Sequence, residues 1–320
     1  MQLAKDVIAP ELNIFTEYYE NAVKSNALLM DRVMSYLVAK KGKLMRPMFV
    51  LLCAKLGGEV NEQSYRAATL VEMLHTASLV HDDMVDDASE RRGNFSVNAL
   101  WKNKVAVMSG DYLFASGLIL SLANGDTQIL KIYNEAIQQM IESELLQMVK
   151  SRKPDLSEEA YFKIINAKTA SFLAAACAAG AASTMKDEAV IQKIHSFGTK
   201  AGMAFQLKDD LFDFGVDDVG KPIGNDIKEK KITLPLIYTL QNSAPAIKKK
   251  LLYIVHHKNE DAEQVAHAID VVRASGGIAY TEQVMNQYRD DALELLYEFP
   301  ASDSRSALEE MVRYITDRKY

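Results

Sequence analysis

Apolar residues recur at intervals of three and four positions along most of the chain, which places them on one face of an α-helix. Segments that alternate apolar and polar residues, as strands do, are nearly absent. Seven prolines fall between the periodic segments or at their starts, where helices begin and end. The pattern predicts helices over residues 6–24, 26–40, 44–57, 61–86, 97–122, 127–151, 157–184, 188–215, 233–241, 245–256, 261–275, 278–297 and 303–317.

Several of these helices are longer than the average in globular proteins, and such lengths suit a bundle with a deep interior cavity. We therefore expect an all-α fold, a large single-domain helical bundle around a central cavity, over residues 1–320. The segment 170–180 is built almost entirely of small residues. It either lets helices approach closely or leaves a channel unfilled, and we favour close packing.

Composition narrows the class of protein. The chain is 48% hydrophobic and 25% charged, which is ordinary for a soluble protein. A net charge of −6 argues against nucleic-acid binding. Cys53 and Cys177 lie in apolar segments and are expected to be core residues in a reducing compartment. The N-terminus lacks signal-peptide features, and the longest apolar run, 172–182, is too short to span a bilayer. We expect a cytoplasmic protein.

The first candidate site is an acidic cluster at the end of an apolar helix. Asp82 and Asp86 are four residues apart and so leave the same helix face, and Asp83 and Asp87 repeat that spacing. Carboxylates this dense repel one another unless a cation neutralises them, and oxygen ligands indicate a hard ion such as Mg²⁺. A solvated helix end is the alternative, but the preceding turns are apolar. We interpret His81, just before the cluster, as a carboxylate partner.

Arg91 and Arg92 follow the first cluster closely. Arginine binds phosphate oxygens with two parallel hydrogen bonds. Carboxylates that hold a metal, next to paired arginines, form the surroundings that a diphosphate needs.

A second acidic cluster repeats this design. Asp209 and Asp213 are four residues apart on another apolar helix, and Gln206 lies one turn before them. Lys221 and Lys231 follow in a loop and could reach a diphosphate, but the loop alone favours solvated charges for most of its lysines. One DDxxD cluster is moderate evidence for a metal-binding site, and two such clusters on separate apolar helices are strong evidence.

The chain resembles the trans-polyprenyl diphosphate synthase family, of the long-chain type represented by octaprenyl and heptaprenyl diphosphate synthases. The resemblance covers nearly the whole chain and rests on the order of GKxxRP, HDDxxD with RRG, a Lys-Thr pair, FQxxDDxxD, GKPxGxD and KxTLP. Lys41 and Lys230 occupy loop positions where many members have glycine. We expect altered loop conformation there, with function retained.

The resemblance implies a type I isoprenoid-synthase fold, usually a homodimer, and a role for each matching residue. The residues implied to hold isopentenyl diphosphate are Lys43, Arg46, His75 and Arg92. Those implied to bind the allylic diphosphate are Arg91, Lys168, Lys221 and Lys231, with Thr169 and Gln206 near the reacting carbon. The implied ligands of three Mg²⁺ ions are Asp82, Asp83 and Asp86 in the first cluster and Asp209 and Asp213 in the second.

The implied reaction is ionisation of the allylic diphosphate, condensation and elimination, with the departing pyrophosphate as the base. Electrostatic stabilisation of the leaving group is its main physical cause. The residues expected to carry catalysis are Asp82, Asp86, Lys168, Thr169, Gln206 and Asp209. We expect the product lipid to be passed to membrane enzymes.

Product length is partly readable from the residues before the first cluster. The family's tail channel runs down this helix, and short-chain relatives usually have a bulky aromatic four or five residues before the first aspartate. Those positions are Ser78 and Ala77 here. Since neither closes a channel about 6–7.5 Å below Asp82, we expect a long-chain product of about C30–C50.

Three other classes share part of this pattern. A class I terpene cyclase has one aspartate-rich helix but needs no isopentenyl diphosphate site. An HD-type phosphohydrolase matches only the pair His81-Asp82. A non-catalytic partner subunit of a heteromeric synthase is expected to lose the acidic clusters, and this chain keeps both.

Overall fold

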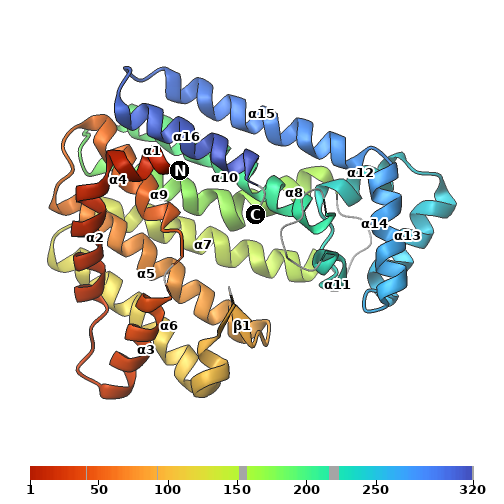
Figure 1. The fold of residues 1–320 in the computed structure, drawn as a ribbon, viewed down its shortest axis with the longest axis horizontal. Helices are drawn as coiled ribbons and strands as arrows, with labels where there is room; N and C mark the ends of the chain where they lie inside the picture. Colours follow the sequence, from red (N-terminus) through yellow and green to blue (C-terminus); the bar gives the residue numbers. More distant parts are fainter. Residues whose placement is uncertain (41, 92, 151–156, 216–222, 319–320) are drawn as a thin grey trace. The chain divides into compact units, whose positions relative to one another are not determined.

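The computed structural model describes residues 1–40, 42–91, 93–150, 157–215 and 223–318. Their secondary structure is almost entirely helical (Figure 1). The helices are α1 (Gln2–Val7), α2 (Ala9–Ala22), α3 (Leu28–Ala39), α4 (Met45–Gly57), α5 (Glu62–Val85), α6 (Val97–Ala123), α7 (Thr127–Lys150), α8 (Glu158–Ile165), the π-helical turn η1 (Asn166–Ala170), α9 (Ser171–Ala182), α10 (Glu188–Asp213), α11 (Asn225–Lys228), α12 (Leu234–Asn242), α13 (Pro245–His257), α14 (Ala262–Ala274), α15 (Gly277–Tyr297) and α16 (Asp303–Asp317). A two-stranded hairpin, β1 (Glu90–Arg91) and β2 (Asn94–Phe95), interrupts them. The all-α prediction is confirmed.

The predicted helix over 6–24 is wrong at its start. The structure ends α1 at Val7 and begins α2 at Ala9. Pro10 lies in the first turn of α2, where its missing N–H costs nothing, whereas a continuous helix would set its ring against the carbonyl of residue 6. The proline therefore marks a boundary inside the periodic segment.

Two compact units divide the chain. The first comprises Met1–Asn134, Ala175–Ile194 and Ala301–Leu308, and the second comprises Glu135–Ala174, His195–Pro300 and Glu309–Tyr320. A single domain over residues 1–320 stays a prediction.

In the first unit, α5 is fixed at its start by a capping box. The Asn61 side chain accepts hydrogen bonds from the backbone N–H groups of Gln63 and Ser64 at 2.9 and 3.1 Å, and the Asn61 N–H donates to Ser64 Oγ at 3.3 Å. These bonds satisfy groups that a helix leaves open at its N-terminus. The helix packs against α2, α4 and α6, so its far end, with the first acidic cluster, has a fixed direction.

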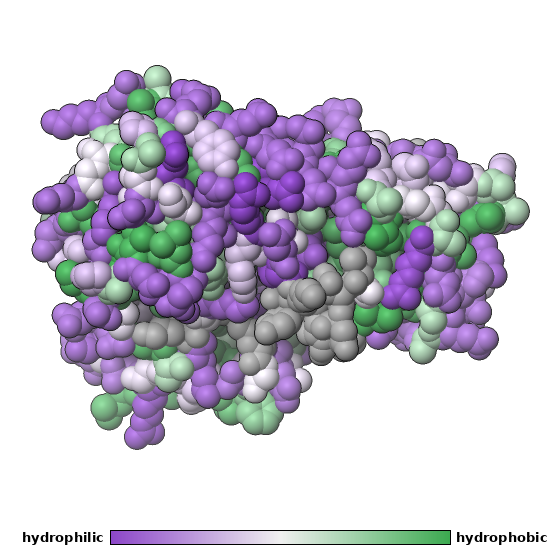
Figure 2. Space-filling model, turned by 45° about the horizontal axis from the view of Figure 1, so that its top comes forward, coloured by the Kyte–Doolittle hydropathy of each residue, from purple (hydrophilic) through white to green (hydrophobic). Residues whose placement is uncertain are grey.

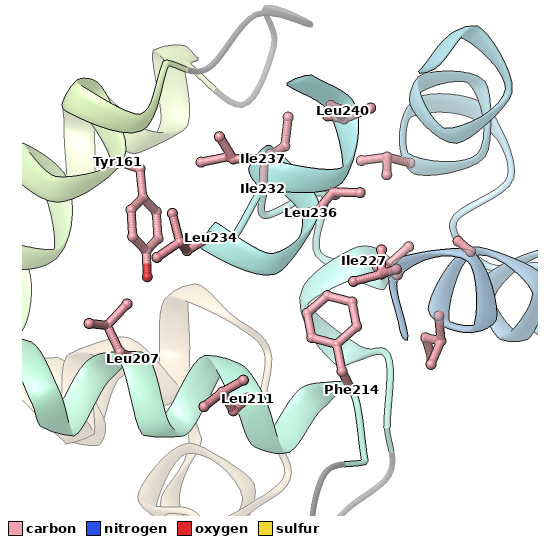
Figure 3. Close-up of a cluster of buried hydrophobic side chains, with 14 of the residues drawn as sticks. Tyr161, Leu207, Leu211, Phe214, Ile227, Ile232, Leu234, Leu236, Ile237 and Leu240 are labelled. Carbon is pink, nitrogen blue, oxygen red and sulfur yellow. The ribbon is translucent and has the colours of Figure 1, made fainter. Parts of the chain in front are cut away.

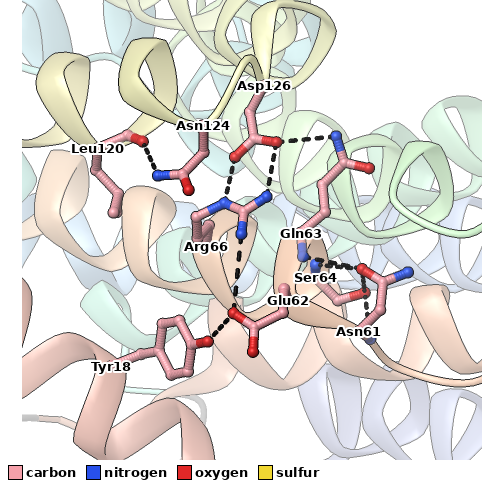
Figure 4. A network of polar contacts seen from close by, with 9 residues as sticks. All are labelled: Tyr18, Asn61, Glu62, Gln63, Ser64, Arg66, Leu120, Asn124 and Asp126. Carbon is pink, nitrogen blue, oxygen red and sulfur yellow. Dashed lines mark hydrogen bonds and ion pairs between the residues drawn. The ribbon is translucent and has the colours of Figure 1, made fainter.

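A buried ion pair ties α5 to the turn between α6 and α7 (Figure 4). Arg66 Nε and Nη2 donate to the two carboxylate oxygens of Asp126 at 2.6 and 3.0 Å. Gln63 donates to the same carboxylate at 3.0 Å. The Asp126 side chain is 2% exposed, so the parallel bonds offset the cost of burying it.

The small residues of α9 serve close packing. Residues 175–181 are buried, and a Cβ atom added to Gly180 would lie 2.2 Å from the backbone oxygen of Val50 in α4. Only glycine permits this approach. The interpretation of this segment as a packing surface is confirmed here.

Gly180→Ala should therefore lower the free energy of unfolding by about 1–3 kcal/mol, because the new methyl group forces α4 and α9 apart. Urea unfolding followed by circular dichroism measures this loss. Gly58→Ala, at the end of α4, is the control, since nothing lies within 4 Å of its new Cβ atom. Equal losses in both variants would contradict the packing argument.

The second unit has its own apolar core (Figure 3). Leu207 and Leu211 project from α10, and Phe214 lies just beyond the end of that helix, beside Ile227 of α11. All four side chains are completely buried. This core fixes the last turns of α10, which carry the second acidic cluster.

Two helical stretches are long and apolar enough to span a membrane by length and composition alone: α6 and Glu158–Ala182. The expectation that the longest apolar run is too short to span a bilayer was based on residues 172–182. These residues are the last part of the longer stretch Glu158–Ala182. In the most apolar 18 residues of the stretch Glu158–Ala182, 78% are buried, which indicates a core segment. The corresponding value in α6 is 33%, so α6 presents apolar side chains at the surface. On the face of the molecule in Figure 2, hydrophobic residues form separate patches among hydrophilic ones.

Candidate active site

The first acidic cluster lies where α5 ends. Asp82 and Asp86 are exposed and one helical turn apart, as predicted. Asp83 is buried, and its carboxylate accepts a hydrogen bond from Arg91 Nε at 2.5 Å. Asp87 has φ 49 and so leaves the helical path. The cluster therefore has an exposed pair of carboxylates beside a buried, paired one.

The β1–β2 hairpin brings Arg91 back to the cluster. Arg91 and Asn94 are partners in the hairpin. Ser96 follows it, donates to the carbonyl of Ala88 at 2.7 Å, and caps α6 through the N–H of Ala99. Sequence analysis predicted the proximity of Arg91 but not the hairpin. Its partner Arg92 lies outside the described residues.

Two of the residues implied to hold isopentenyl diphosphate meet in the first unit. Arg46 Nη1 and His75 Nε2 lie 2.9 Å apart, although they come from α4 and α5. Lys43 is exposed in the segment before α4. A cavity in the same unit is lined by His75, predicted for isopentenyl diphosphate, and by Arg91, predicted for the allylic diphosphate. Gly42 and Asp83 also line it.

His81 has partners on α6. Its Nε2 lies 3.2 Å from the carbonyl oxygen of Val107 and 3.6 Å from a carboxylate oxygen of Asp111. A Cβ atom on Gly110 would lie 2.2 Å from the same nitrogen. His81 therefore bonds a backbone carbonyl and lies near one carboxylate, and Gly110 makes the space for its ring. Its interpretation as a carboxylate partner stays a prediction.

The second acidic cluster lies on the last turns of α10, in the second unit. Asp209 is 35% exposed and accepts a hydrogen bond from Arg318 Nη2 at 2.5 Å. The guanidinium also lies over the rings of Phe205 and Phe212, at 4.2 and 5.3 Å from their centres. Asp213 accepts the backbone N–H groups of residues 225 and 226 at 2.8 and 3.1 Å, so this predicted metal ligand also caps α11.

A hydrogen-bonded chain joins the reacting-carbon residues to this cluster. Thr169 Oγ1 donates to Gln206 Oε1 at 2.8 Å, and Gln206 Nε2 donates to Asp210 Oδ1 at 2.9 Å. Tyr161 Oη donates to the other oxygen of Asp210 at 2.5 Å. The chain fixes the orientation of the Gln206 amide. Sequence analysis missed Tyr161, for which the sequence has no signal.

The position of Thr169 follows from two local features. Lys168 and Thr169 lie in η1, a π-helical turn between α8 and α9, and such turns occur frequently at functional sites. Gly202, one turn before Gln206, allows close approach, since an added Cβ atom would lie 2.6 Å from the Cα of Ala170.

Lys168 is placed beside polar residues of α7. Its Nζ atom lies 2.6 Å from Glu144 Oε2 and donates to Gln147 Oε1 at 3.2 Å. Lys231 has an ion pair with Glu229. Lys221 lies outside the described residues.

Four of the predicted residues line one cavity in the second unit. Its lining also includes Tyr161 and two acidic residues, and the predicted members are Lys168, Thr169, Gln206 and Lys231. The acidic members are Asp210 and Asp226. Asp226 is the last residue of the GKPxGxD segment, so a signal for it existed, although no role was predicted.

Two of the carboxyl groups that line this cavity have raised pKa values. Burial, and to a smaller extent the nearby charges of Asp209 and Asp213, raises the pKa of Asp210 to about 7. Burial and the charges of Asp210 and Asp213 raise the pKa of Asp226 to about 8. A cation bound here would stabilise the ionised carboxylates.

The carboxylates of the two clusters offer ligands for a metal ion. Among the described residues, no group of three or more His, Cys, Asp or Glu side chains is close enough to form a metal site alone. The exposed pair Asp82 and Asp86, and Asp209, offer oxygen donors only. These residues fit a hard divalent ion that takes its remaining ligands from water and from a substrate's phosphates. Because the two clusters belong to different units, a shared site stays a prediction.

Comparisons with known proteins agree with this reading. The polyprenyl synthetase family model matches residues 28–272. Heptaprenyl diphosphate synthase component 2 of Bacillus subtilis is 31% identical over 322 residues, covering 100% of this chain and 91% of the relative. Octaprenyl diphosphate synthase of Escherichia coli is 32% identical over 291 residues, covering 89% of each.

Solved structures extend the likeness to the fold. A polyprenyl synthase from Caulobacter crescentus, complexed with calcium and isoprenyl diphosphate, has a TM-score of 0.92 and 31% identity over 100% of this chain and 98% of its own. A decaprenyl diphosphate synthase from Rhodobacter capsulatus has a TM-score of 0.94 and 28% identity over 99% and 98% of the two chains. The predicted isoprenoid-synthase fold is confirmed. By its motifs, its fold and these matches, the chain belongs to the polyprenyl synthetase family.

Proposed function

We propose that this chain is a prenyltransferase that condenses an allylic diphosphate with isopentenyl diphosphate, releases pyrophosphate and repeats the step to a long-chain, all-trans polyprenyl diphosphate. The observation that carries the proposal is the cavity of the second unit, where Lys168, Thr169, Gln206 and Lys231 converge beside the second acidic cluster. Cationic side chains suit a diphosphate, and fixed dipoles suit a carbocation. The relatives named above are prenyl synthases, which favours this function over a terpene cyclase.

Diphosphate binding falls to the cationic residues. Lys168 and Lys231 each have a carboxylate partner, Glu144 and Glu229. A diphosphate carries more negative charge than one carboxylate, so it competes for these ammonium groups. In the first unit, Arg91 is held by Asp83, and Arg46 by His75. These partners hold the cationic side chains in positions from which they can bind the oxygens of a diphosphate.

The proposed metal ligands are Asp82 and Asp86, with Asp83 beside them, and Asp209 with Asp213. Bound Mg²⁺, three ions by analogy with the family, supplies positive charge that stabilises the leaving pyrophosphate. Asp82 and Asp86 would hold the metal from exposed positions at the end of α5, and Asp209 and Asp213 from partly exposed positions at the end of α10. The Caulobacter crescentus relative was solved in complex with calcium, which supports a divalent ion as the metal of this chain.

The hydrogen-bonded chain of the second unit suits the reacting carbon. The Thr169 hydroxyl donates its hydrogen bond to the Gln206 side-chain carbonyl, and the Gln206 amide donates one to Asp210. The lone pairs of Thr169 Oγ1 therefore remain for an electron-poor carbon. Tyr161 holds Asp210 from the other side, so the dipoles are fixed before substrate binds. The departing pyrophosphate takes the proton in the elimination step.

Arg318 has a testable consequence for metal binding. Its guanidinium occupies a carboxylate oxygen of Asp209, so a metal ion must compete with it. Arg318→Ala should raise the affinity of the substrate-free protein for Mn²⁺ about five-fold, since a partly exposed ion pair contributes on the order of 1 kcal/mol. Titration calorimetry measures this affinity.

Arg313→Ala is the matched control for Arg318→Ala. Arg313 lies on α16, which ends one residue before Arg318, and it pairs with Glu309 at 3.0 Å. It should leave Mn²⁺ affinity nearly unchanged. If both variants bind Mn²⁺ as the unchanged protein does, Asp209 is no ligand of that ion.

We propose a homodimer that pairs through α6. Three large apolar residues are exposed on this helix: Met108 (63% exposed), Ile119 (67%) and Leu122 (61%). Their separations of eleven and three residues place them on the same side of the helix. Such a stripe suits a partner helix. A heteromeric partner is the second candidate, because the Bacillus subtilis relative is called component 2. Sedimentation of the purified chain distinguishes a homodimer from a monomer that awaits another subunit. A cytoplasmic location stays a prediction.

Pyrophosphate release tests the proposed function against its rival. A prenyl-elongating enzyme should release pyrophosphate only when isopentenyl diphosphate and an allylic diphosphate are both present with Mg²⁺. A terpene cyclase would release it from the allylic diphosphate alone. Release that needs no isopentenyl diphosphate would therefore contradict the proposal.

A further inference from the structure

Helix α13 carries a concentration of positive charge that contrasts with the rest of the chain. Residues 245–258 contain four lysines and two histidines but no aspartate or glutamate, whereas the whole chain has a net charge of −6. Lys248, Lys249 and Lys250 are all exposed. Within the part of the chain that the structure describes, none of these three lysines has an ion pair. Their charge is therefore available to an external partner.

The helix is held firmly on its other side. Leu251, Ile254 and Val255 are buried, and α13 packs against α12 and α14 in the second unit (Figure 1). This packing fixes which residues face outward. The lysines are thus presented by a rigid helix rather than by a loop.

An aromatic side chain lies at the centre of the outward face. Tyr253 is 54% exposed, and its ring centre lies 5.3 Å from that of His257, one turn on. Lys249 and Lys250 precede it by one turn on the same side. Ile247, 43% exposed, lies in the first turn of α13, one turn before the buried Leu251. Tyrosine prefers the boundary between lipid and water, where its ring is buried and its hydroxyl hydrated.

We infer that the outward face of α13 docks on an anionic lipid surface. Lysines without internal partners attract acidic headgroups, and the exposed Tyr253 among them enters the headgroup layer. A nucleic acid is the weaker fit, because a single helix face offers few phosphate contacts, whereas the exposed Tyr253 suits the boundary between lipid and water. The inference is independent of the proposed activity, and vesicle binding can be measured without it.

Vesicle flotation tests the inference with the full chain. The protein should bind vesicles made of equal parts phosphatidylcholine and phosphatidylglycerol and should not bind pure phosphatidylcholine. K248Q/K249Q/K250Q should bind the anionic vesicles about 100-fold more weakly, because each lysine near such a surface contributes about five-fold. Binding should also weaken as salt is raised.

Two further variants make the test specific. K5Q/K163Q/K186Q removes the same charge from exposed lysines that lie elsewhere and should bind as the unchanged protein does. Tyr253→Ser should weaken binding several-fold with little change in its salt dependence. Equal binding of the two triple variants, or equal binding to both kinds of vesicle, would overturn the inference. Binding to heparin without binding to vesicles would also overturn it, in favour of a soluble polyanion.

Discussion

Asp82→Asn should lower the rate constant of prenyl transfer by about 10²–10³, because it weakens the proposed binding of the Mg²⁺ ion whose positive charge stabilises the leaving pyrophosphate, while it keeps the shape of the side chain. Asp82 is exposed on the last turns of α5, so the fold should not suffer. Steady-state kinetics at saturating Mg²⁺ and substrates measure the rate constant, and circular dichroism checks the fold.

Asp87→Asn is the control for this loss. Asp87 is also exposed and lies five residues further on, but its φ of 49 takes it off the helix, and asparagine tolerates that conformation well. Its rate constant should stay within a few-fold of the unchanged protein. Similar losses in both variants would mean that negative charge in general, rather than the metal geometry of Asp82, carries the effect.

Ser78→Phe should shorten the product to about C15–C20, because an aromatic ring one helical turn from Asp82 closes the proposed tail channel. Ser78 and Asp82 leave the same face of α5, and Ser78 is partly exposed. Extraction of the products, dephosphorylation and reversed-phase chromatography give their length. The rate of the first condensation should change little.

Ser78→Ala should keep the long product, since it adds no bulk. Ala77 is completely buried, so Ala77→Phe tests the same channel at a greater risk to stability, and its thermal midpoint should be recorded beside its product length. A full-length product from soluble, folded Ser78→Phe would show that the tail takes another path.

The fold was largely predictable because its helices are long and their apolar faces periodic. The periodic pattern missed the break at Ile8, although Pro10 marked it, and it could not detect the hairpin at Glu90–Phe95 or the four-residue helix α11. Elements shorter than two helical turns show no period to read.

The candidate site was predictable where a motif lies within one helix, and hidden where contacts are distant in sequence. Asp82 and Asp86 could be placed from their spacing alone. The bond from Tyr161 to Asp210 and that from Arg318 to Asp209 join residues 49 and 109 positions apart, and no local pattern encodes them. The resemblance to the family predicted an altered loop conformation at Lys230, where many members have glycine. In the structure, the backbone of Lys230 has φ 58, which lies in the left-handed region that favours glycine.

The most direct test of the central claim is the product itself. The purified chain should be incubated with farnesyl diphosphate, labelled isopentenyl diphosphate and Mg²⁺, and the extracted lipids separated by chain length. We predict a series of labelled polyprenyl diphosphates that ends at a long-chain product and disappears when the metal is chelated. If no isopentenyl unit is added to farnesyl diphosphate by the homogeneous chain, it is not by itself the elongating enzyme proposed here.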